Sequence, residues 1–197
     1  NIAFLSQSGA LGTAVLDMAA GIGVGFSKFV SLGNKALLDE AALLEYFAHD
    51  RKTKVIAIYA EDLRHPEMIR EAARKMSRAK HPKPIIVLKS GKTSAGASAL
   101  SSHTGSLAGN DASYEALFEE AGILRVETAE DLFLLARAFS LAPLPVGNNV
   151  AIVTNAGGPG VLSADAAVGA GLSLAVLSNE TTTELKTFLP SASSTKN

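Results

Sequence analysis

The chain has 197 residues, of which 47% are hydrophobic and 19% are charged. Its 18 basic and 19 acidic residues give a formal net charge of −1, which argues against binding to nucleic acid or to an anionic membrane. The chain has no cysteine, so disulfides, cysteine–zinc sites and thiolate catalysis are excluded.

The length fits one large domain, or one domain with part of a second. The mean hydropathy of +0.22 indicates enough apolar material for a sizeable buried core. Neither a signal peptide nor a membrane span is predicted, so we expect a cytoplasmic protein. The sequence starts within a predicted strand and ends without a natural stop, and we therefore expect a piece of a longer protein. The low charged fraction predicts that another domain or subunit covers part of the surface, as in an oligomer.

Short apolar runs alternate with longer helical patterns, which predicts a parallel, doubly wound α/β sheet. The predicted strands cover residues 1–7, 26–33, 55–60, 84–91 and 122–128. The predicted helices cover residues 9–21, 39–49, 66–80, 111–121 and 129–141. Asp39 is the expected N-cap of the second helix. The small residues of segment 93–109, with Gly91, Gly96, Gly105 and Gly109 in or beside it, predict a loop suited to motion.

A linker is predicted at LAPLPVGNN (141–149), where two prolines precede Gly-Asn-Asn. We therefore expect one domain over residues 1–143 and the truncated start of a second over residues 147–197. The second part is predicted to contain a strand over 149–155, a helix over 158–169, a strand over 172–178 and a helix from 180.

Two glycine-rich turns, SQSGALG (6–12) and NAGGPG (155–160), each join a strand to a helix. The first N–H groups of a helix are unpaired, and with the helix dipole they can hold a phosphate without Lys or Arg. The candidate phosphate-binding residues are Ser6, Ser8, Gly9, Ala10, Asn155, Gly157, Gly158 and Gly160. Neither turn carries the GK[ST] of a P-loop or a full GxGxxG fingerprint, so a tight turn without a ligand explains each turn equally well.

His103 is the leading candidate for catalysis, because the residues of segment 89–111 around it are nearly all small or hydroxylic. A ligand can reach such an imidazole, which suits a nucleophile or base near neutral pH. The alternative is a histidine that only caps a turn or helix.

Glu61 directly follows the strand over 55–60, at the sheet edge where doubly wound folds place their sites. A carboxylate there can hold one imidazole nitrogen and stabilise the charged ring. Asp62 is a competing candidate, and a solvated loop carboxylate is the plainer alternative. Lys89, at the end of the next strand, is either a phosphate contact or a solvated lysine.

Four stretches carry a family resemblance: LSQSGALGTAVLDMA, FSKFVSLGNKALLDEAALLEYF, the segment that runs from KSGKTSAGA through SHTGSLAGND to GILRVET, and NNVAIVTNAGGPGVLSADA. By these stretches the chain resembles the NDP-forming acyl-CoA synthetases, such as ADP-forming acetate–CoA ligase, which are relatives of succinyl-CoA synthetase. The resemblance implies a flavodoxin-like subdomain over residues 1–143 and the start of a second such subdomain over residues 147–197.

The same resemblance implies the site and the reaction. His103 matches the family's phosphorylated histidine, Glu61 matches its acidic partner, and the helices after the two glycine-rich turns match those that hold the phosphate. Acyl-CoA, phosphate and ADP would be interconverted with carboxylic acid, CoA and ATP. The full-length enzyme would use CoA, ADP or ATP, and Mg²⁺, mostly in CoA-binding and ATP-grasp domains or subunits outside these residues.

Two other functions remain open from the sequence. Similar sequence occurs in protein lysine acetyltransferases, whose synthetase-like region could serve as a regulatory module without phosphoryl transfer. A flavodoxin-like domain could also bind FMN or a nucleotide. The chain has no Trp and three Tyr, and its turns contain no aromatic clamp, which disfavours the flavin alternative.

Overall fold

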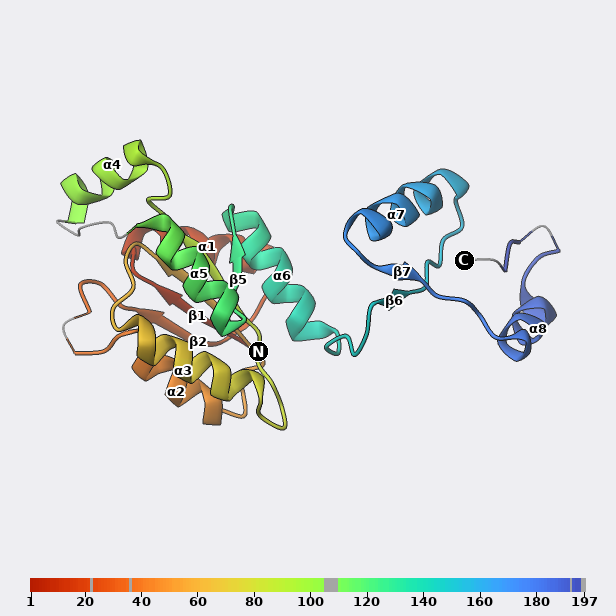
Figure 1. The fold of residues 1–197 in the computed structure, drawn as a ribbon, viewed down its shortest axis with the longest axis horizontal. Coiled ribbons are helices and arrows are strands. Elements are labelled where there is room, and N and C mark those ends of the chain that lie inside the picture. The colour runs from red at the N-terminus through yellow and green to blue at the C-terminus, as the bar shows by residue number, and fades with distance from the viewer. Residues whose placement is uncertain (22, 36, 105–109, 192, 196–197) are drawn as a thin grey trace. The chain divides into compact units, whose positions relative to one another are not determined.

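Five parallel strands form one sheet in the order β2–β1–β3–β4–β5 (Figure 1). The strands are β1 (Ile2–Ser6), β2 (Phe26–Ser31), β3 (Val55–Ala60), β4 (Ile85–Lys89) and β5 (Leu124–Val126). This order is that of flavodoxin-like sheets, so the predicted fold class is confirmed. The computed structural model describes the chain except for residues 22, 36, 105–109, 192 and 196–197, and it describes residues 103 and 104 through their backbone alone.

Helices cover both faces of this sheet (Figure 1). The covering helices are α1 (Gly9–Gly21), α2 (Glu40–His49), α3 (Pro66–Ser77), α5 (Asp111–Ala121) and α6 (Ala129–Leu141), whereas α4 (Ser94–Thr104) stands apart from the sheet. One apolar cluster packs α2, α3 and α5 on one face, and a second packs α1 and α6 on the other. Strand β1 is buried along its whole length, as expected for a parallel strand that is covered on both sides.

An aromatic group joins β1, β2 and α6 at the centre of the second cluster. The ring of Phe4 is fully buried, with ring centroids 5.5 Å from Phe29, 6.1 Å from Phe26 and 5.4 Å from Phe133. Because aromatic rings remove more apolar surface from water than most side chains, this group is a large contributor to the stability of the sheet.

The prediction of a loop over residues 93–109 is wrong for most of that segment, because Ser94–Thr104 form helix α4. The Thr93 side chain caps this helix, since its Oγ1 accepts a hydrogen bond from the Gly96 N–H at 3.1 Å. Three alanines in SAGASA favour the helix, and the glycines and serines around them concealed that preference in the sequence. The side chain of Leu100 is buried, 3.5 Å from the position of a Cβ on Gly91. Gly105 and Gly109 lie outside the described residues.

The chain divides into two compact units, Asn1–Pro143 and Leu144–Asn197. The second unit contains β6 (Asn149–Val150), α7 (Gly157–Gly169), β7 (Ser173–Leu174) and α8 (Asn179–Phe188). Strands β6 and β7 pair in parallel over two residues each, so the strands predicted over 149–155 and 172–178 are wrong in extent. Neither α7 nor α8 buries a residue, and the Val153 side chain is 97% exposed. Val176, in the second predicted strand, is 98% exposed as well, so these two apolar positions are not packed within the described part of the unit.

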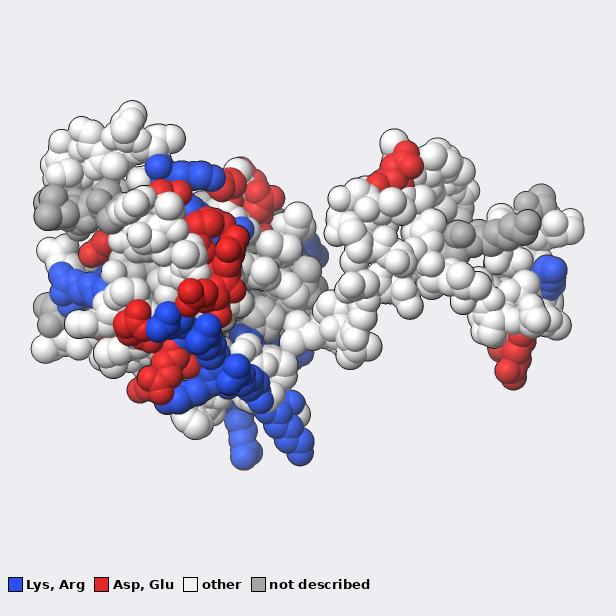
Figure 2. All heavy atoms as spheres, viewed as in Figure 1, with Lys and Arg blue, Asp and Glu red and all other residues white. Residues whose placement is uncertain are grey.

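Basic side chains gather over α3 beside acidic ones (Figure 2). Several of these charges pair, since Arg70 Nη1 lies 2.9 Å from Glu120 Oε2 and Lys75 Nζ lies 2.9 Å from Glu71 Oε1. The mixture of signs is typical of a solvated helix face. None of the helices in the described ranges has the length and apolar character that crossing a membrane requires.

Asp39 caps α2 as predicted, because its Oδ1 accepts a hydrogen bond from the Ala42 N–H at 2.9 Å. We expect Asp39→Ala to lower the free energy of unfolding of the first unit by about 1 kcal/mol, measured by urea denaturation. The carboxylate also lies 3.8 Å from His65 Nε2. Asp39→Ser separates the two contacts, since serine restores the cap without the charge and is expected to recover most of the stability. Equal loss in both variants would contradict the capping explanation.

Candidate functional site

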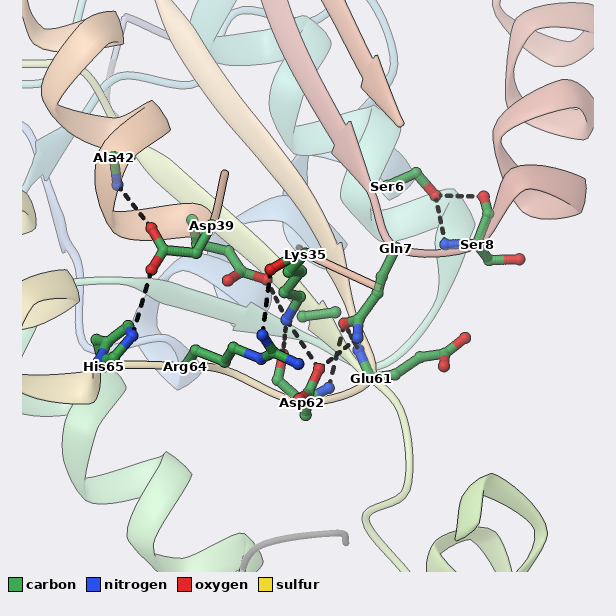
Figure 3. Close-up of polar contacts among 12 residues, drawn as sticks. Ser6, Gln7, Ser8, Lys35, Asp39, Ala42, Glu61, Asp62, Arg64 and His65 are labelled. Atoms are coloured by element: carbon green, nitrogen blue, oxygen red, sulfur yellow. Dashed lines mark hydrogen bonds and ion pairs between the residues drawn. The ribbon is translucent and has the colours of Figure 1, made fainter. Parts of the chain in front are cut away.

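The carboxyl ends of β1 and β3 meet where the strand order reverses, which is the position of ligand sites in doubly wound sheets. Gln7 follows β1, and its side chain reaches the turn after β3 (Figure 3). Gln7 Oε1 accepts hydrogen bonds from the N–H groups of Glu61 at 2.7 Å and Asp62 at 3.2 Å. Gln7 therefore fixes one turn against the other. The sequence analysis did not identify it.

Glu61 is 6% exposed, and its Oε2 has no hydrogen-bond partner among the described residues. Its side chain extends away from the side chains of Lys35 and Asp62 (Figure 3). A buried carboxylate oxygen without a partner costs folding free energy, so native proteins keep few of them unless a function requires one. Glu61 is thus available to a donor that the described residues do not supply.

Asp62, the competing candidate, is already paired. Lys35 Nζ donates hydrogen bonds to the Asp62 carbonyl oxygen at 2.7 Å and to Asp62 Oδ1 at 2.8 Å, and Gln7 Nε2 also donates to Oδ1. Burial would raise the pKa of Asp62, but the hydrogen bonds from Lys35 and Gln7 outweigh it and hold that pKa below its usual value. The geometry therefore favours Glu61 over Asp62 as the available carboxylate.

Lys35 and Glu40 form a fully buried ion pair beside this turn. The Nζ–Oε1 distance is 2.6 Å, and both side chains are 0% exposed. Burial raises the pKa of Glu40, and the charge and hydrogen bond of Lys35 oppose that shift. Lys35 has a left-handed backbone with φ 55°, and its carbonyl accepts a hydrogen bond from Arg64 Nη1 at 3.1 Å. The sequence analysis missed this pair, and its only signal was one basic and two acidic residues in the stretch KALLDEA (35–41).

The turn before α1 presents backbone N–H groups at Gly9 and Ala10, both of which are exposed. The hydroxyls of the two serines shape this turn: Ser6 Oγ donates to the Ser8 carbonyl at 2.7 Å, and Ser8 Oγ accepts from the Leu11 N–H at 3.3 Å. A Cβ on Gly9 would meet no atom within 4 Å. Ser6 has therefore used its donor inside the turn, and the open side of the turn lies at Gly9.

The turn before α7, in the second unit, is built in a related way. Ala156 is the N-cap and has no side-chain hydrogen bond to the helix, while Thr154 Oγ1 accepts from the Ala156 N–H at 3.1 Å. A Cβ on Gly157 or Gly158 would meet open space, whereas one on Gly160 would come within 3.1 Å of Thr154 Cγ2. Asn155 is exposed at the same turn.

Lys89 ends β4, beside Ala60 in the sheet. It is 5% exposed, so the alternative of a solvated lysine is wrong. Its Nζ donates to the Ser90 carbonyl at 2.5 Å and lies 4.6 Å from the ring centroid of Tyr114. Burial lowers the pKa of Lys89, and the Asp111 carboxylate opposes that shift.

His103 lies in the last turn of α4, and its side chain is outside the described residues. The described part of the chain contains no group of three His, Cys, Asp or Glu side chains that could hold a metal ion.

Comparison with known proteins places these features in a family context. Residues 1–139 match the family described as succinyl-CoA ligase like flavodoxin domain. The chain is 48% identical over 197 residues to the alpha subunit of acetate–CoA ligase [ADP-forming] II of Pyrococcus furiosus. It is 46% identical over 196 residues to acetate–CoA ligase [ADP-forming] of Methanocaldococcus jannaschii.

Among solved structures, the chain is similar to dinucleotide forming acetyl-coenzyme A synthetase 1 of Ca. Korarchaeum cryptofilum in complex with phosphate and ADP, with a TM-score of 0.90 and 42% identity. All of this chain is covered, but only 42% of that structure's chain. The chain likewise spans 42% of the Pyrococcus subunit and 27% of the Methanocaldococcus enzyme. These proteins are thus much longer than the 197 residues compared with them.

Proposed function

The chain belongs to the family of succinyl-CoA ligase like flavodoxin domains, and from that premise we propose that it is the phosphoryl-relay part of an NDP-forming acyl-CoA synthetase. The intact enzyme would interconvert acyl-CoA, phosphate and ADP with carboxylic acid, CoA and ATP. The observation that carries this proposal is the buried carboxylate of Glu61, which retains an unpaired oxygen at the switch point of the sheet.

His103 is the proposed nucleophile. A neutral imidazole nitrogen attacks the phosphorus of an acyl phosphate, the bond from phosphorus to the acyl oxygen breaks, and the carboxylate leaves. The proton on the other ring nitrogen stays there, where Glu61 accepts its hydrogen bond and stabilises the positive ring. Transfer of the phosphoryl group from His103 to ADP then restores the neutral imidazole. Each of these two phosphoryl transfers has a lower barrier than direct transfer from the acyl phosphate to ADP.

Backbone N–H groups are the proposed phosphate ligands. Phosphoryl transfer depends mainly on positioning and on charge stabilisation, and the start of a helix supplies both. In the first unit these groups belong to Gly9 and Ala10, with Ser6 and Ser8 shaping the turn. In the second unit, we propose that the N–H groups of Gly157 and Gly158 bind phosphate in the same way, with Asn155 and Gly160 supporting the turn. Lys89 remains a proposed phosphate contact.

We propose that residues 147–197 are the start of a second flavodoxin-like CoA-ligase subdomain. The CoA, ADP or ATP, and the small carboxylic acid would bind mostly in other domains or subunits, a CoA-binding domain and an ATP-grasp region among them. Mg²⁺ would accompany the nucleotide in the ATP-grasp region. An oligomer in the cytoplasm is the proposed setting.

Labelling with radioactive acetyl phosphate tests this function in the intact protein that contains these residues. We expect label that is labile in acid and stable in base, as phosphohistidine is, and its loss in His103→Ala. His81→Ala, which removes an exposed histidine, is the matched control and should label as the parent does. If the intact protein takes up no label, the phosphoryl-relay function is wrong, and the regulatory-module alternative is favoured.

A further inference from the structure

We propose that Lys35 is a positioning residue for Glu61: it pairs with Asp62 and fixes the turn after β3, so that Glu61, and not Asp62, remains to pair with His103. This inference rests on the proposed role of Glu61 in the phosphoryl relay. It gives a functional role to the buried Lys35–Glu40 ion pair, which takes no part in the proposed phosphoryl transfer.

Lys35 joins the start of α2 to the turn after β3, two parts of the first unit that are distant in sequence. It comes from the connection between β2 and α2, its Nζ lies 2.6 Å from the carboxylate of Glu40 at the start of α2, and it donates two hydrogen bonds to Asp62 after β3. One of these goes to the Asp62 backbone carbonyl, at 2.7 Å. Lys35 therefore anchors the backbone of the turn as well as its side chain.

Gln7 holds the same turn from the β1 side (Figure 3). Its Oε1 accepts the N–H groups of both Glu61 and Asp62, while its Nε2 donates to the Asp62 carboxylate. Asp62 is thus held by Lys35 and Gln7 together, and the backbone of Glu61 is held by Gln7. The Glu61 side chain projects from this network, and its Oε2 has no hydrogen-bond partner among the described residues.

The difference between the paired Asp62 and the available Glu61 matters for the proposed hydrogen bond to His103. Two adjacent carboxylates at one sheet edge would compete for a single imidazole N–H. The ammonium of Lys35 is fully buried and removes Asp62 from that competition, since a paired and hydrogen-bonded carboxylate has little left to offer a second donor. Loss of Lys35 would leave the Asp62 carboxylate without its cation, directly beside Glu61.

A double-mutant cycle tests the proposal in the intact protein, with the initial rate of acid-labile labelling from acetyl phosphate as the readout. We expect Lys35→Met to slow labelling by on the order of 10–10²-fold, because small displacements of catalytic groups have effects of this size. The concentration of acetyl phosphate that gives half the maximal rate should stay the same, since Lys35 is not among the proposed phosphate ligands. In the Glu61→Gln background, Lys35→Met should add no further loss.

Lys83→Met is the matched control. Lys83 also binds backbone carbonyls, donating to Ala48 at 3.3 Å and Asp50 at 2.8 Å. It precedes β4, so it lies at the amino ends of the strands, opposite the candidate site. It should label at the parental rate. If Lys35→Met does not fold, Lys35→Met/Glu40→Leu removes both charges of the buried pair together, which apolar replacements often tolerate. The same loss and the same non-additivity are expected of it.

The outcomes separate this inference from the proposed function. If Glu61→Gln labels at the parental rate, the role of Glu61 in the relay is wrong, and the inference fails with it. If Glu61→Gln is slow and Lys35→Met slows labelling equally in both backgrounds, the relay stands and the positioning role of Lys35 is overturned. Parental labelling by folded Lys35→Met overturns it as well.

Discussion

Replacement of Glu61 by glutamine is expected to slow phosphorylation of His103 by roughly 10²–10⁴-fold, the range over which positioned acid–base groups act. Glutamine keeps nearly the same shape but loses the negative charge that would stabilise the ring once it carries both phosphate and proton. Because the Glu61 backbone N–H donates to Gln7, the turn itself should survive the change. Rapid-quench labelling with acetyl phosphate, performed on the intact protein, measures the rate.

Glu127→Gln provides the control for that experiment. Glu127 follows β5 at the same end of the sheet, but its side chain is 63% exposed and pairs with Lys92 at 2.5 Å. This variant should label at the parental rate. The assignment of Glu61 would be contradicted if Glu61→Gln labels normally while Asp62→Asn, tested beside it, does not.

Phe4→Ala is expected to lower the free energy of unfolding of the first unit by about 3–5 kcal/mol. The ring is fully buried, and three other aromatic rings surround it with centroids 5.4–6.1 Å away, so a cavity at the sheet centre would not collapse easily. Typical domains have a total stability of about 5–15 kcal/mol, so this loss would leave a substantial unfolded fraction under mild denaturant. Urea denaturation of the purified variant measures it.

Leu134→Ala is the comparison for Phe4→Ala. Leu134 lies on α6 like Phe133, but its side chain is 65% exposed, and its truncation should change the stability by less than about 0.5 kcal/mol. Similar losses of unfolding free energy in both variants would contradict the large contribution of Phe4 to the stability of the core.

Much of the fold could be predicted because its signals are local. Apolar runs and caps indicate each strand of the first unit and each of its helices except α4, and Asp39 marks the start of α2. The strands of the second unit were predicted too long, since a strand extends only as far as a neighbour pairs with it. Helix α4 was missed because its glycines and serines are typical of loops, although its alanines and the cap at Thr93 favour a helix.

The site was predictable only in part, because its decisive contacts join distant segments. The position of Glu61 after a buried strand was enough to propose it, but nothing local separates it from Asp62. Lys35 makes that distinction from 27 residues away in the sequence. Gln7 acts across 54 residues on Glu61. Burial of Lys89 against Tyr114 is likewise a product of tertiary packing, and a charged residue at a strand end gives no hint of it.

The place of β1 within the sheet has a consequence for how the chain is synthesised. This strand precedes its two neighbours in the sequence, yet it lies between them, paired with β2 on one side and β3 on the other. On the ribosome, β1 must therefore remain incomplete until Ala60 has emerged, with an open edge available to other chains. Removal of Ile2–Ser6 would separate β2 from β3, β4 and β5, so shortened versions of this sequence should keep that segment.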